Sequence, residues 1–91
     1  MVTAIILVNA ERGRIAKLAQ EMADLEGISE VYSVSGRYDL IAIVRVPDND
    51  ALARMVTEQM SGLEGITHTE SLLSFRAFSK HDLDQMFSIG L

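Results

Sequence analysis

The chain repeats part of itself at an offset of 38 residues. Leu25-Glu26-Gly27-Ile28-Ser29 returns as Leu63-Glu64-Gly65-Ile66-Thr67, and Ala4-Ile5-Ile6 returns as Ala42-Ile43-Val44. Two copies are too few for a solenoid, in which several units must stack to bury a common core. A duplicated strand–helix–strand unit instead fits the split βαβ arrangement. We therefore expect one α+β domain over residues 1–91 with a ferredoxin-like βαββαβ order.

Each copy contains a strand signal followed by a helix signal. The first strand is expected over residues 2–8, and Asn9 is a candidate N-cap for the helix that follows. Glycine is common just after a helix, so Gly27 and Gly65 predict where the two helices end. Residues 47–50, Pro-Asp-Asn-Asp, supply acidic N-cap candidates for the second helix. The other strands are expected over residues 28–35, 40–46 and 66–78, and a tail with a short helix carrying Leu83, Met86 and Phe87 over residues 78–91.

The two central strands are apolar on both faces. In residues 2–8, Val2, Ala4, Ile6 and Val8 share one face, while Ile5 and Leu7 share the other. Residues 40–46 repeat this pattern. The helices of a ferredoxin-like fold lie on one face only, and soluble monomers seldom expose a large apolar patch. We therefore expect a homodimer with facing antiparallel sheets, a dimeric α+β barrel, and no monomer at micromolar concentration.

Charge and cysteine content exclude several classes of protein. The net charge of −5 and the sparse Lys and Arg residues disfavour direct nucleic-acid binding. No apolar run is long enough to span a bilayer, and the N-terminus shows no signal peptide, so no membrane association is expected. The absence of cysteine rules out disulfides and thiolate metal sites, which makes the cytoplasm the expected location.

The joint between the second and third strands is the first place to look for a ligand site. It consists of Gly36, Arg37, Tyr38 and Asp39. In one interpretation it is a plain hairpin turn, in which Gly36 supplies positive φ and Asp39 bonds nearby N–H groups. In the other it holds a zwitterion: Arg37 or loop N–H groups would pair with a carboxylate, and Asp39 would accept from an ammonium.

The fourth strand alternates side chains of two kinds. Thr67, Thr69 and Ser71 are expected on one face, and His68 and Glu70 on the other together with Ile66 and Leu72. The pattern suits a half-exposed edge strand, and it also suits a row of hydroxyl donors lining a cleft between subunits.

Metal and catalytic sites find little support in the sequence. His68 and His81 have no nearby His or Cys and only Glu70 and Asp82 as helpers, so no metal site and no cofactor are expected. The five methionines are expected in the core. No Ser-His-Asp set, phosphate loop or carboxylate pair stands at usable spacing, so we do not expect an enzyme.

Two motifs together resemble one family. Ser33-Val34-Ser35-Gly36-Arg37-Tyr38-Asp39-Leu40 leads into an apolar strand, and Leu63-Glu64-Gly65-Ile66 leads to Thr69 and Ser71. Over essentially the whole chain this resembles the ligand-sensing (RAM) domain of the Lrp/AsnC, or feast/famine, transcription regulators. The resemblance implies facing-sheet dimers, often a ring of four dimers (an octamer), with amino-acid effectors bound in clefts between dimers.

The same resemblance implies roles for individual residues. Gly36, Tyr38 and Asp39 would contact the effector from the loop, and Thr69 and Ser71 would add hydroxyls from a neighbouring subunit. The chain departs from the pattern at Arg37, where many members carry an acidic residue. It also opens directly on a strand, so we expect a stand-alone sensing domain without the family's N-terminal helix-turn-helix.

The expected function is therefore amino-acid sensing and oligomerisation in transcription regulation, through co-assembly with full-length regulators. Two alternatives stay open at this point. Small monooxygenases share the dimeric α+β barrel architecture, and His68 or Tyr38 would then be catalytic. The domain could also serve assembly alone, without a ligand.

Overall fold

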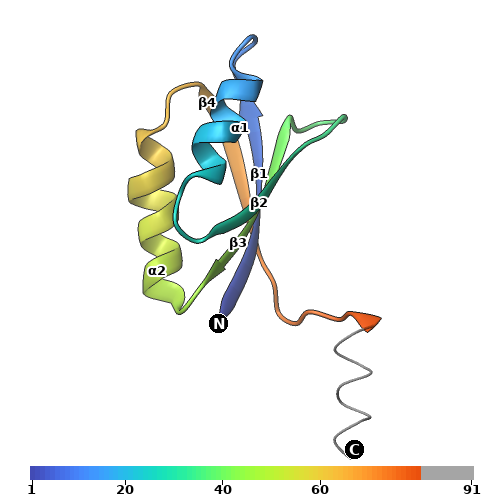
Figure 1. Cartoon of the computed structure of the whole chain (residues 1–91), viewed down its shortest axis with the longest axis vertical. Helices are drawn as coiled ribbons and strands as arrows, with labels where there is room; N and C mark the ends of the chain where they lie inside the picture. The colour runs from blue at the N-terminus through green and yellow to red at the C-terminus, as the bar shows by residue number, and fades with distance from the viewer. Residues whose placement is uncertain (81–91) are drawn as a thin grey trace, which may run out of the picture.

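The computed structural model describes residues 1–80 and shows a four-stranded antiparallel sheet with the strand order β2-β3-β1-β4 (Figure 1). The order of elements confirms the βαββαβ prediction. The bounds are β1 (Val2–Ala10), α1 (Ile15–Ala23), β2 (Ile28–Ser33), β3 (Leu40–Val46), α2 (Asn49–Arg54), the π-helical η1 (Met55–Gln59), the 3-10 turn η2 (Met60–Gly62) and β4 (Ile66–Leu73). No helix within residues 1–80 is long and apolar enough to cross a membrane.

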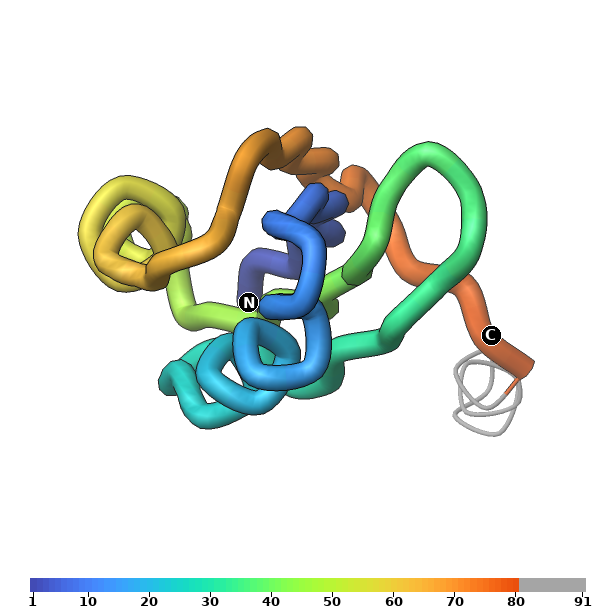
Figure 2. The backbone as a smooth tube through the Cα atoms, turned by 90° about the horizontal axis from the view of Figure 1, so that it is seen from above, coloured from blue at the N-terminus to red at the C-terminus, as the bar shows by residue number. Residues whose placement is uncertain are grey.

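Both helices lie on one face of the sheet, and the core lies between them and the two central strands (Figures 1 and 2). Alternate residues of β1 and β3 point into this core, as the period-two pattern predicts. The fully or almost fully buried side chains are Ala4, Ile6, Val8, Leu18, Met22, Leu40, Ala42, Val44, Met55 and Met60.

Within residues 1–80, no helix lies over the opposite face of the sheet. We call it the helix-free face. Ile5 lies opposite Ile43, and Leu7 lies opposite Ile41, so four aliphatic side chains form its centre. All four are partly exposed. Tyr32 of β2 and Leu72 of β4 flank them and are 49% and 45% exposed. The prediction that β1 and β3 are apolar on both faces is confirmed.

One of the two predicted helix caps is wrong, and the other is confirmed. Asn9 does not cap α1, because β1 continues through Ala10 and the chain then turns before α1 begins. Asp48 does cap α2, since its Oδ1 accepts a hydrogen bond of 2.8 Å from the N–H of Ala51. An acidic side chain at this position satisfies an N–H group that the helix leaves unpaired.

The second helical stretch widens at its middle. Residues five apart lie about 140° apart around a regular α-helix, so Met55 and Met60 could not both face the sheet. The π-helical η1 removes this conflict: the N–H of Met60 donates to the carbonyl of Met55. Both methionines are consequently buried, at 1% and 3% exposed, as the sequence pattern predicts.

Two glycine turns connect the duplicated halves of the chain. Gly27 and Gly65 both have φ of +98°, a conformation that favours glycine. The carbonyl of Gly27 accepts from the N–H of Arg45 at 2.8 Å, and the carbonyl of Gly65 accepts from the N–H of Glu11 at 2.7 Å. Each half therefore anchors its helix-to-strand turn on a strand end of the other half.

β4 differs from the prediction in length and in register. It ends at Leu73 rather than near Phe78, and residues 74–80 leave the sheet as a C-terminal arm. A bulge at Thr67 breaks the alternation, because His68 pairs with Asn9 while Ile66 pairs with Ala10. Ile66 therefore lies on the helix side of the sheet and not beside His68. The predicted tail helix with Leu83, Met86 and Phe87, and His81 before it, lies outside the described residues.

Candidate functional site

The loop between β2 and β3 closes over the end of β1. Its backbone is held by the N–H of Val34, which donates to the carbonyl of Asp39 at 3.0 Å, and by the N–H of Asp39, which donates to the carbonyl of Val8 at 2.9 Å. Gly36 at the tip has φ of +123°, so the loop uses a glycine where a side chain would be strained. Gly36 and Arg37 are exposed.

The Asp39 carboxylate is already engaged within the protein. Its Oδ2 accepts a partly buried hydrogen bond of 2.9 Å from the N–H of Ala10, the last residue of β1. This bond fixes the loop to the central strand. The bond gives Asp39 a structural role in the turn, and the carboxylate keeps lone pairs for a further donor, so both interpretations of this joint stay open.

Tyr38 reaches from the loop to the edge strand β4. Its hydroxyl donates to Oε2 of Glu70 across 3.4 Å, and its ring stacks on His68 with centroids 6.4 Å apart and 21° between the planes. Glu70 lies opposite Leu7 in the sheet, which places the three side chains on the helix-free face. We call Tyr38, His68 and Glu70 the Tyr38 cluster.

The two predicted hydroxyl donors lie on the other face. Thr69 lies opposite Val8 and Ser71 opposite Ile6, and these partners are buried under the helices. Within one protomer the structure therefore brings Tyr38 together with His68 and Glu70, and separates it from Thr69 and Ser71. Strict alternation along β4 already placed His68 and Glu70 on one face, but nothing in the sequence indicated that Tyr38 would cross β1 to meet them.

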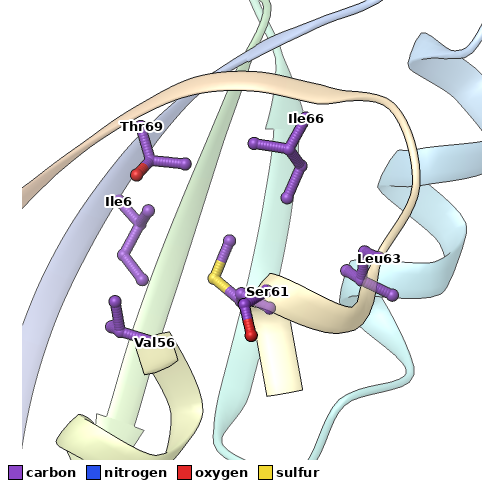
Figure 3. Close-up of a pocket in the computed structure, with 7 residues that line it drawn as sticks. Ile6, Val56, Ser61, Leu63, Ile66 and Thr69 are labelled. Atoms are coloured by element: carbon purple, nitrogen blue, oxygen red, sulfur yellow. The ribbon is translucent and has the colours of Figure 1, made fainter. Parts of the chain in front are cut away.

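A pocket of about 220 Å³ opens on the helix side between η1, η2 and β4 (Figure 3). Thr69 is the one predicted site residue that lines it, and the aliphatic Ile6 lines it as well. The Ser61 hydroxyl donates to the carbonyl of Thr57 at 2.6 Å, so it is partly engaged by its own helix. The lining residues are Ile6, Val56, Met60, Ser61, Leu63, Ile66 and Thr69.

A second polar group lies at the other end of the helix-free face. The Tyr32 hydroxyl donates to the Glu30 carboxylate, and Arg45 lies 3.7 Å from the other oxygen of Glu30. The hydrogen bond and the negative charge of Glu30 raise the pKa of Tyr32 above its usual value, which the charge of Arg45 offsets in part. In residues 1–80 no three His, Cys, Asp or Glu side chains come together as a metal-binding group.

The curated proteins that this chain matches include HTH-type transcriptional regulators. The HTH-type transcriptional regulator FL11 of Pyrococcus abyssi is 33% identical over 72 residues, which are 77% of this chain and 47% of FL11. The chain spans less than half the length of the curated relatives that it matches. These relatives are named as HTH-type transcriptional regulators.

Solved structures share the same fold. TTHA0845 from Thermus thermophilus is 42% identical with a TM-score of 0.82, covering 88% of this chain and 100% of that one. The transcriptional regulator NMB0573 of Neisseria meningitidis, solved as a complex with L-Met, is 15% identical with a TM-score of 0.76, over 86% of this chain and 52% of its own. The family model described as "Lrp/AsnC ligand binding domain" matches residues 3–83. On the agreement of sequence and fold over nearly its whole length, the chain belongs to the Lrp/AsnC ligand-binding domain family.

Proposed function

We propose that the chain is an amino-acid-sensing and assembly module in transcription regulation. Membership of the Lrp/AsnC ligand-binding domain family over residues 3–83 is the observation that carries this proposal. The named complex of a structural neighbour, NMB0573 with L-Met, makes amino acids the first ligand class to test.

The module is proposed to dimerise through the helix-free face. Ile5, Leu7, Ile41 and Ile43 are partly exposed there in a single protomer, and the described helices lie on the other side. A second copy that covers these side chains would remove apolar area from water at roughly 25 cal/mol per Å². A symmetric pairing uses the same patch on both copies, so one surface serves both partners.

The ligand is proposed to lie between subunits. The Tyr38 cluster and the hydroxyls of Thr69 and Ser71 lie on opposite faces of one sheet, so a site that uses both sets needs β4 of one subunit and the loop of another. Exposed N–H groups near Gly36 and the guanidinium of Arg37 suit a ligand carboxylate. The exposed carboxylate of Glu70 suits the ammonium group, and Asp39 could also accept from it, because each carboxylate keeps lone pairs beyond its one hydrogen bond within the protein.

Titration calorimetry with each of the twenty amino acids, followed by light scattering, tests the proposal. We expect heat and a change of particle size with at least one of them, because a ligand stabilises the assembly it binds better. Glu70→Gln should weaken that binding about tenfold or more through loss of a charged hydrogen bond. Glu58→Gln, on the exposed side of η1, should leave it unchanged. No heat and no size change with any amino acid would contradict the sensing role and leave an assembly domain.

We also propose a cytoplasmic protein that reaches DNA through partners. The net charge of −5 disfavours direct contact with phosphates, and the curated relatives are HTH-type regulators more than twice as long as the matched region. Co-assembly with full-length regulators, up to a ring of four dimers, would join this module to their DNA-binding parts. Affinity purification of the tagged chain from its own cells should recover such a regulator, and its absence at native expression would contradict co-assembly.

A further inference from the structure

The C-terminal arm, residues 74–80, carries aromatic side chains that are exposed in the part of the chain that the structure describes. The N–H of Ser74 donates to the carbonyl of Thr3 at 2.9 Å, which holds the start of the arm on the sheet. Beyond that point Phe75 is 100% exposed and Phe78 is 72% exposed. Arg76 lies over the Phe78 ring, 5.9 Å from its centroid, so this contact lies within the arm.

The arm leaves the sheet on the side where a second copy would pack. Figures 1 and 2 show the arm leaving on the side of the sheet away from α2, below the β2–β3 loop. The helix-free face looks toward this side, and its central side chains are partly exposed. A second copy packed on that face would therefore stand in the path of the arm.

The charge of the arm complements the rest of the chain. Residues 74–80 carry Arg76 and Lys80 and no acidic side chain, whereas residues 1–73 carry eleven Asp or Glu against six Lys or Arg. A basic arm is attracted to an acidic second copy, and the helix-free face bears exposed Glu30 and Glu70.

The sequence beyond Lys80 adds further apolar residues, among them Leu83, Met86 and Phe87.

We propose that the C-terminal arm docks on a second copy of this chain, where Phe75 and Phe78 pack against the rim of the partner's helix-free face. The inference rests on the proposed dimer and extends it: each subunit clasps the other with its arm. The arm of each subunit thus binds the rim of the other subunit. The two-fold symmetry of a dimer makes this exchange reciprocal.

A photo-reactive benzoyl-phenylalanine at position 78 tests the exchange in the full chain. Because it replaces one aromatic residue by another, we expect it to fold and, after irradiation, to give a covalent dimer on a denaturing gel. The same group at Gln20, exposed on the surface of α1, should give none. A chain that stays monomeric on the gel with the probe at position 78 would overturn the exchange.

Sedimentation provides a second measurement. Phe75→Ser with Phe78→Ser should raise the dimer dissociation constant about tenfold or more, because burial of aromatic area is lost in both subunits. An unchanged dissociation constant would overturn the role of the arm while leaving the dimer in place. A wild-type chain that sediments as a monomer at micromolar concentration would instead contradict the proposed dimer itself, so the two failures are distinguishable.

Discussion

The carboxylate of Asp39 accepts a hydrogen bond of 2.9 Å from the N–H of Ala10, which stands 29 positions earlier in the chain. Ala10 is the last residue of β1, and the carbonyl of Val8 in the same strand accepts from the N–H of Asp39. The hairpin loop is thus attached to the central strand through one residue, which contributes both its backbone and its side chain.

Removal of this side chain should destabilise the fold. Asp39→Ala leaves the N–H of Ala10 partly buried and unpaired, so we expect the free energy of unfolding to fall by about 1–3 kcal/mol. Asp39→Asn keeps an accepting oxygen and should lose less. Urea unfolding at one fixed protein concentration measures both, and Asp24→Ala, at an exposed position, should change the value by no more than about 0.5 kcal/mol. Equal values for Asp39→Ala and Asp24→Ala would contradict the anchoring role.

Alanine substitutions at two glycines with positive φ distinguish the cost of backbone strain from the cost of crowding in the core. A Cβ on Gly27 would stand 2.8 Å from Cγ1 of Val46 and 2.9 Å from Cε of Met55, whereas a Cβ on Gly13 would meet nothing within 4 Å. Both substitutions to Ala force a left-handed conformation, at a cost of about 1–2 kcal/mol. Gly27→Ala should cost about 1–3 kcal/mol more than Gly13→Ala, because the core must shift. Thermal and urea unfolding measure the loss of stability in each variant. Equal losses would show that Val46 and Met55 move aside from the added Cβ at little cost.

A charge at the centre of the helix-free face should separate the proposed dimer. Ile43→Lys places an ammonium group where each copy would bury an aliphatic chain, twice per symmetric pair. We expect the dimer dissociation constant to rise at least about a hundredfold. Gln20→Lys adds the same group to the helix layer and serves as the matched control. Sedimentation velocity across a concentration series measures the change, and a stable Ile43→Lys dimer would place the interface elsewhere.

The hydrogen bond between Tyr32 and Glu30 should be visible in a pH titration. The bond and the charge of Glu30 favour the protonated phenol, so the pKa of Tyr32 lies above the usual value near 10. Any stability from this contact is then fully present below the pKa of the unfolded chain, and it is lost as pH rises through the folded pKa.

Ultraviolet absorbance of the tyrosinate reports this ionisation. In a Tyr38→Phe background Tyr32 is the one remaining tyrosine, because the chain has two. Glu30→Gln should lower its pKa toward 10, while Glu26→Gln should not. If the pKa of Tyr32 is the same with and without Glu30→Gln, the carboxylate and the phenol do not interact in solution.

Local sequence patterns predicted the fold well in the duplicated strand–helix–strand units. A run of residues that is apolar on both faces predicted the bounds of β3, and helical spacing with Gly27 and Gly65 predicted the positions of both helices. The errors arose where longer-range contacts decide. Asn9 has the side chain of a cap, but pairing with His68 keeps it in β1. The bulge at Thr67 depends on how β4 meets β1, so the sequence of β4 alone placed Ile66 on the wrong face.

The candidate site was predictable only in part. Gly36 and Asp39 were correctly expected in one loop, because glycine and short polar side chains mark turns. The reach of Tyr38 across β1 to Glu70 depends on the strand order, which no local pattern contains. For the same reason the sequence did not indicate that Asp39 is bonded to Ala10, or that Thr69 and Ser71 lie across the sheet from Tyr38.

The reciprocal carbonyl contacts of Gly27 and Gly65 make the two copies of the duplicated unit dependent on each other. A polypeptide cleaved within the β2–β3 loop would give two fragments, and each would lack the strand end that receives its own turn. Neither fragment would be a self-sufficient folding unit, but mixed together they could complement each other. The two duplicated units are therefore parts of one fold and not independent modules.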